Sequence, residues 1–109
     1  MESLDEQGNF VGLDIDIAHE IASDLGIKAE FQNVAWEQIF EALLEGKVDI
    51  LISAITITPE RAEEMAFSDP YFNAGQVIVT TTDGLNGTNG TEDLAGKKIG
   101  VQINTTSHA

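Results

Sequence analysis

The chain has 109 residues, which is enough for one domain at most, and at this length only about two thirds of the unfolded surface can be buried. Its 19 acidic and 5 basic side chains give a formal net charge of −14, which disfavours binding to nucleic-acid phosphates and to anionic membrane surfaces. It has no cysteine, which excludes disulfide bonds and thiol metal sites, and no stretch reaches the ~20 apolar residues that span a bilayer.

The first part of the chain predicts a hairpin and then a helix. A Gly-Asn pair at residues 8–9 lies between apolar residues, and such a pair favours a tight turn. From residue 14 onward, apolar side chains recur every three or four positions. This pattern ends at Gly26, a residue type that is common at helix C-termini. We therefore expect a helix over residues 14–25.

The middle of the chain alternates between strand and helix patterns. Residues 28–34 alternate polar and apolar side chains, which predicts a short strand with one covered face. Residues 36–45 place apolar side chains on one helical stripe with glutamates opposite, and Gly46 ends the pattern. Residues 48–52 are nearly all apolar, as in a central strand covered on both faces. Two more β-rich segments are residues 75–82 and 97–102.

A polar turn follows the expected central strand. Thr58 is the predicted N-cap of a short helix that ends near residue 65, with Pro59 at its first position. In open α/β sheets, small ligands bind at the carboxyl ends of buried strands, where hydroxyls and unpaired backbone groups collect. We therefore expect a small-molecule site here, and we expect Arg61 to face it.

The same turn carries a resemblance to a known family. Residues 54–61 (AITITPER) and 67–71 (FSDPY) closely resemble extracellular solute-binding proteins of the amino-acid class, family 3, which are receptors of ATP-driven uptake systems. The similarity extends, in the family's order and spacing, to residues 12–17, 46–49 and 94–101 and to Trp36 with Leu43. It implies an α/β fold, a three-layer sandwich with a mainly parallel sheet, as in one lobe of the type II periplasmic-binding-protein fold.

The resemblance implies three ligand contacts from the first lobe. Arg61 matches the arginine that clamps the α-carboxylate, whose oxygen pair suits a planar guanidinium; the alternative is a surface ion pair with Glu60 or Glu64. Thr56 matches a residue whose hydroxyl and backbone amide contact the ligand, and Ala54 would offer its carbonyl to the ammonium group. For both, the alternative is ordinary bonding within the turn.

An aromatic residue and the second lobe complete the implied site. Trp36 matches a position where an aromatic ring stacks on the ligand, although its spacing also fits the core stripe of residues 36–45. Thr105 and Thr106 fall where relatives have a Gly-Thr pair whose backbone amides bind the carboxylate. Asn104 replaces that glycine, and asparagine tolerates left-handed backbone conformations better than most residues.

The resemblance also implies how the chain is divided. Residues 1–82 correspond to a partial first lobe and residues 83–109 to a hinge-proximal connection and the start of the second lobe. From the resemblance we expect residues 1–109 to lack the family's first strand, which lies between those matching residues 28–34 and 48–53, and a secretory signal. Because unpaired buried backbone groups cost ~1 to 3 kcal/mol each, we expect the isolated chain to be marginally folded or a strand-swapped homo-oligomer.

These features together predict a binding protein. The resemblance implies a periplasmic or extracellular receptor for a polar amino acid, with transporter membrane subunits as partners. We expect no cofactor, catalytic residue, metal site or nucleic-acid partner, since no nucleophile has an adjacent base and His19 and His108 lie far apart in sequence. The alternatives on the same fold are the ligand-binding domain of a sensor kinase or glutamate-gated channel, and a cyclic-acid dehydratase.

Overall fold

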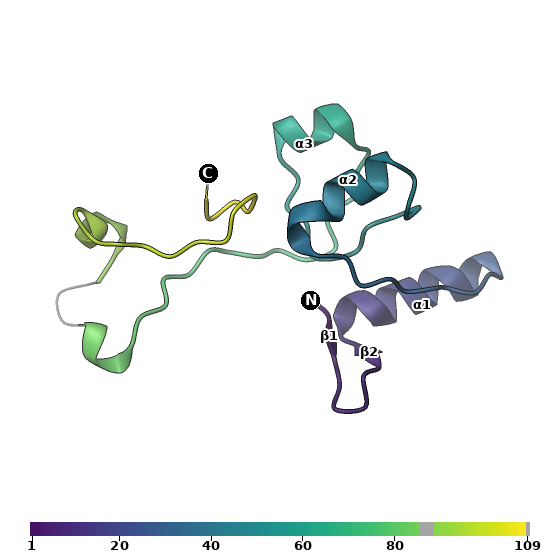
Figure 1. Ribbon diagram of the computed structural model, residues 1–109, viewed down its shortest axis with the longest axis horizontal. Coiled ribbons are helices and arrows are strands. Elements are labelled where there is room, and N and C mark those ends of the chain that lie inside the picture. Colours follow the sequence, from purple (N-terminus) through teal and green to yellow (C-terminus); the bar gives the residue numbers. More distant parts are fainter. Residues whose placement is uncertain (86–88, 109) are drawn as a thin grey trace. The chain divides into compact units, whose positions relative to one another are not determined.

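The computed structural model describes residues 1–85 and 89–108, and the chain separates into two units, Met1–Pro70 and Tyr71–Ala109 (Figure 1). The division lies upstream of the lobe boundary expected at residues 82–83. Gln76 accounts for part of the difference, because it bonds within the second unit. Its amide nitrogen donates to the Thr106 hydroxyl at 2.8 Å, and its amide oxygen accepts from the Ser107 hydroxyl at 2.7 Å. The lobe boundary itself stays a prediction.

The first unit begins with the predicted hairpin. Strands β1 (Ser3–Leu4) and β2 (Phe10–Val11) pair antiparallel, with Leu4 opposite Phe10. The turn between them is closed by the Asp5 N–H, which donates to the Asn9 carbonyl at 2.9 Å. Gly8 has a φ of 84°, a conformation that side chains with a Cβ rarely adopt, so the turn depends on glycine at this position.

Helix α1 (Leu13–Leu25) confirms the expected amphipathic helix. Gly26 ends it in the left-handed conformation (φ 66°, ψ 29°), and the Ile27 N–H donates back to the Ala22 carbonyl at 2.9 Å. This hydrogen bond satisfies one of the carbonyls that a helix C-terminus leaves without an intrahelical partner. The apolar stripe is buried at Ile15, Ala18 and Ala22.

Two shorter helices also begin and end where local signals place them. A single 3₁₀ turn, η1 (Trp36–Gln38), leads into α2 (Ile39–Leu44), and the Lys47 N–H closes its C-terminus on the Ala42 carbonyl at 2.9 Å. Helix α3 (Pro59–Glu64) begins at the predicted N-cap, because the Thr58 hydroxyl accepts from the Arg61 N–H at 3.3 Å. Both helices therefore confirm the sequence prediction.

The segments expected to be strands do not form a sheet. The hairpin of β1 and β2 is the only sheet in the described residues, and residues 28–34, 48–52, 75–81 and 97–102 belong to no ladder (Figure 1). Within the described part of the chain, the backbone groups of residues 28–34 and 98–101 make no hydrogen bond. A strand requires a neighbouring strand to bond with, so strand-forming side chains alone do not create one.

The core is small as a consequence. The buried apolar side chains are Ile15, Ala18, Ala22, Ile39 and Ala42. Large aliphatic side chains are exposed in each unit, among them Leu25 at 66% and Ile50 at 62% in the first and Val77 at 82% in the second. Much of the apolar side-chain surface that strands would bury is therefore in contact with solvent.

The second unit contains two single-turn 3₁₀ helices, η2 (Thr82–Leu85) and η3 (Thr91–Leu94). Both fall in or beside the start of residues 83–109, the segment expected to hold the hinge-proximal connection, and residues 86–88 lie outside the described residues. In the described part of the chain, no helix has the length and apolar character needed to cross a membrane.

Candidate ligand site around Arg61

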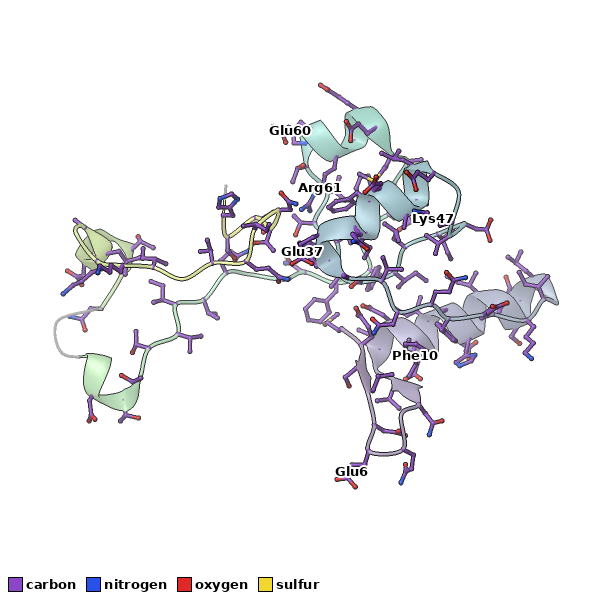
Figure 2. All side chains as sticks on the ribbon, in the orientation of Figure 1. Glu6, Phe10, Glu37, Lys47, Glu60 and Arg61 are labelled. Carbon is purple, nitrogen blue, oxygen red and sulfur yellow. The ribbon has the colours of Figure 1, made fainter. Side chains whose placement is uncertain are left out.

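Arg61 lies in the first turn of α3 and is held at both its backbone and its side chain. Its backbone N–H is bound by the Thr58 cap, and its Nη1 donates to the Thr56 carbonyl at 2.9 Å. The side chain is half-buried. Figure 2 shows it extending from α3 toward α2. The turn of residues 56–58 therefore holds both the backbone of Arg61 and one nitrogen of its guanidinium in place.

An aromatic pair from η1 and α2 meets the guanidinium. The Arg61 Cζ lies 4.9 Å from the centroid of the Phe40 ring, within the range of a cation–π contact. Trp36 packs against Phe40 edge-on, with ring centroids 5.7 Å apart and ring planes at 71°. The two rings are four residues apart, the spacing that brings side chains together on one helix face. Trp36 thus contacts Phe40, which in turn contacts Arg61.

The turn before α3 contains an unusual backbone conformation. Ala54 has a φ of 48°, one of two positive-φ residues other than glycine in the described residues. For a residue with a Cβ this conformation costs roughly 1 to 2 kcal/mol. Upstream of it, the Ser53 hydroxyl bonds to the Glu2 carboxylate. This contact links the turn to the start of β1. Thr56 is exposed, with its carbonyl engaged by Arg61.

The expected second-lobe residues lie in the second unit. Asn104 has a φ of 61°, so it adopts the left-handed backbone conformation that asparagine tolerates better than most residues. The Thr105 hydroxyl donates to the Gln102 carbonyl at 2.7 Å, and the Thr106 hydroxyl accepts from the Gln76 amide at 2.8 Å. A role for Thr105 and Thr106 in one site with Arg61 stays a prediction.

The unit that contains Arg61 is strongly acidic. The first unit contains 16 of the 19 acidic side chains and three of the five basic ones. One of those cations, Lys47, pairs with Glu45 at 2.5 Å, and this hydrogen bond raises the pKa of Lys47 and lowers that of Glu45. Both side chains are exposed. The pair therefore offers little stabilisation.

A hollow of about 360 Å³ lies beside α2, away from the expected contacts. It is lined by residues 32–35 together with polar side chains that include Gln38, Glu41 and Lys47, and by none of the six predicted site residues. Residues 32–34 belong to the segment whose backbone has no partner. The hollow therefore adjoins a segment that has no strand pairing in the described residues.

Comparison with known proteins places the chain in a family. The family model for "Bacterial extracellular solute-binding proteins, family 3" matches residues 1–104. The chain is a member of this family. Its sequence is 32% identical over 105 residues to the ABC transporter arginine-binding protein 1 of Escherichia coli, a match that covers 96% of this chain and 42% of that protein.

Solved structures of family relatives have the same fold. An ancestral arginine-binding protein bound to arginine superposes with a TM-score of 0.91 at 48% identity, covering 98% of this chain and 47% of that one. The ancestral amino acid-binding protein described as a precursor of cyclohexadienyl dehydratase superposes with a TM-score of 0.92 at 42% identity, covering 98% and 48%. The chain therefore spans less than half of each of these relatives, and the expected α/β fold class is confirmed.

The structure brings some of the predicted contacts together. Arg61 bonds to Thr56, and Trp36 reaches Arg61 through Phe40. Phe40 is absent from the sequence prediction because its spacing assigned it to the apolar stripe of α2. The available signal was its position four residues after Trp36, which places both rings on the face that carries the stripe. None of the six ligand contacts is itself observed, so their roles stay proposals.

Proposed function

We propose that the protein binds a free polar amino acid through Arg61, as the receptor component of an ATP-driven uptake transporter. The observation that supports this most directly is the guanidinium held by the Thr56 carbonyl and the Phe40 ring. A carboxylate binds a guanidinium through two parallel N–H···O bonds, which require the guanidinium plane to be oriented. The Thr56 carbonyl and the Phe40 ring are both uncharged groups that restrict the movement of the guanidinium.

The other predicted site residues would bind the ammonium group, the side chain and the carboxylate of the amino acid. Thr56 supplies a hydroxyl and a backbone amide, and the positive φ of Ala54 turns the chain so that its carbonyl can accept from the ammonium group. Trp36 supplies an aromatic wall beside Phe40. Thr105 and Thr106 bind the carboxylate through backbone amides, at a turn whose Asn104 has the required positive φ.

The charge of the first unit supports a cationic ligand within the polar class. An excess of 13 negative charges in this unit attracts cations and raises their local concentration. The E. coli relative and one of the solved structures are named for arginine. Arginine is therefore the first ligand to test. The proposed location is extracellular or periplasmic, where receptors of this family meet their solutes.

Calorimetry on the full-length product of the gene tests this function. We expect arginine to bind with a Kd in the micromolar range or below, with glutamine and glutamate as comparators that differ in side-chain charge. The Arg61→Ala variant provides the matched control, because it removes the proposed carboxylate partner. Absence of heat with every common amino acid would reject the proposal.

A second candidate is a cyclic-acid dehydratase, favoured by the likeness to the precursor of cyclohexadienyl dehydratase. That precursor is itself named as an amino acid-binding protein, which is why binding is the first proposal and an enzyme the second. Incubation of the full-length product with prephenate or arogenate separates the two. Formation of the aromatic product would establish the enzyme, and its absence alongside tight arginine binding would leave the receptor.

A further inference from the structure

We propose that Phe40 is a positioning residue that sets the orientation of the Arg61 guanidinium for the ligand carboxylate. This inference rests on the proposed function, since it assigns Phe40 a role in the same site. The ring centroid lies 4.9 Å from the Arg61 Cζ, so the guanidinium is packed over the ring. The ring offers no oxygen or nitrogen acceptor, so it does not compete with a carboxylate for the guanidinium N–H donors.

The ring is itself braced. Trp36 contacts Phe40 edge-on at 5.7 Å, and both belong to the continuous helical stretch formed by η1 and α2. Phe40 is half-buried, and its helix is anchored by the buried Ile39 and Ala42. The ring therefore has a defined position from which to restrict a long, flexible arginine side chain.

The second constraint on the guanidinium comes from the turn that precedes α3. The Thr56 carbonyl accepts from Nη1 at 2.9 Å. The ring contacts the guanidinium at Cζ and the carbonyl binds it at Nη1, so the two contacts together restrict its rotation more than either does alone. Side-chain ordering that is complete before binding costs nothing when the ligand arrives. Phe40 therefore increases affinity without touching the ligand.

The experiment is a double-mutant cycle measured by calorimetry with arginine, on the full-length product. Phe40→Leu should weaken binding roughly 3- to 30-fold, the range expected for loss of a cation–π contact. Phe40→Tyr, which keeps the ring, should remain within about twofold of the wild type. In an Arg61→Gln background, Phe40→Leu should cause no further loss, because the group that it orients is gone.

Phe10→Leu is the matched control. It makes the same substitution in a ring that packs against Phe31 at 5.8 Å, and we expect affinity to remain unchanged. If Phe40→Leu fails to fold, mono-, di- and trifluorinated phenylalanine at position 40 should lower affinity stepwise, since fluorine withdraws charge from the ring face while keeping its shape.

Three results separate the possible failures. Equal loss from Phe40→Leu in both backgrounds would show a packing role only and overturn the inference, as would a flat fluorination series. An Arg61→Gln variant that binds arginine like the wild type would instead overturn the proposed function.

Discussion

Urea denaturation of the 109-residue chain tests how far local structure can stabilise this protein without the expected parallel sheet. Several aliphatic side chains that a larger sheet would cover are exposed to solvent. Full burial of one such side chain contributes ~1.5 to 3 kcal/mol, so leaving about five of them mostly exposed forgoes ~5 to 10 kcal/mol, comparable to the ~5 to 15 kcal/mol net stability of a typical domain. The exposed side chains include Leu25 at 66%, Val77 at 82% and Val79 at 86%.

We therefore expect no cooperative unfolding transition for a monomer. Trp36, the single tryptophan, should report a gradual change in fluorescence, and circular dichroism should show helix loss without a shared midpoint. If another copy supplies the missing strand pairing, sedimentation should show an oligomer whose urea midpoint rises with protein concentration. A monomer that unfolds in one steep transition, with an m-value of ~1 kcal/mol/M or more, would refute the reasoning.

Three further predictions concern single side chains in the full-length product. Arg61→Ala should weaken amino-acid binding by roughly 2 to 5 kcal/mol, the loss when a desolvated charge pair loses one partner, and Arg61→Lys should restore little of it. If calorimetry shows full affinity in the alanine variant, Arg61 is instead part of a surface ion pair. Ala54→Gly should stabilise by about 0.5 kcal/mol, because relief of the positive φ outweighs the added chain entropy, whereas the control Ala62→Gly within α3 should destabilise by about 1 kcal/mol in urea melts. Hydrogen bonds from the Asn9 side chain and backbone lower the pKa of Asp5. The contribution of Asp5 to folding stability is therefore present above its unfolded-state pKa and is lost as the pH falls through its folded-state pKa. In Asn9→Ala, a carboxyl NMR titration should show the pKa of Asp5 returning toward its ordinary range, and an unchanged pKa would contradict this cause.

The elements that the sequence predicted correctly are those whose signals are local. Gly26 and Thr58 determine where α1 ends and where α3 begins through contacts within five residues of themselves. Residues 28–34 and 97–102 have equally clear strand patterns, but a strand depends on partners far away in sequence. No local pattern states whether such a partner is present, so the sheet was predicted and the structure shows only its unpaired segments.

The same distinction applies to the candidate site. The motif around Arg61 led to its contact with Thr56, because five residues and one capped turn separate them. Phe40 lies 21 positions earlier, and its contact with Arg61 depends on how α2 and α3 pack. Periodicity identified the face of α2 that carries Phe40 but not what that face meets, so a residue on an apolar stripe was assigned to the core.

The contacts that orient the Arg61 guanidinium, from Thr56, Phe40 and Trp36, are mostly local. Helix α3 begins at the Thr58 cap, and helix α2 ends at the turn that contains Gly46. The contact between the Trp36 and Phe40 rings joins residues four positions apart, and the hydrogen bond from Arg61 to Thr56 closes one turn. Orientation of the guanidinium therefore depends on local structure together with one helix–helix contact. Ligand affinity requires more, because a bound carboxylate must also be shielded from water before its ion pair becomes strong. Changes at Phe40 should thus alter the orientation of the Arg61 guanidinium, whereas burial around the site should determine how much a correct orientation adds to ligand affinity.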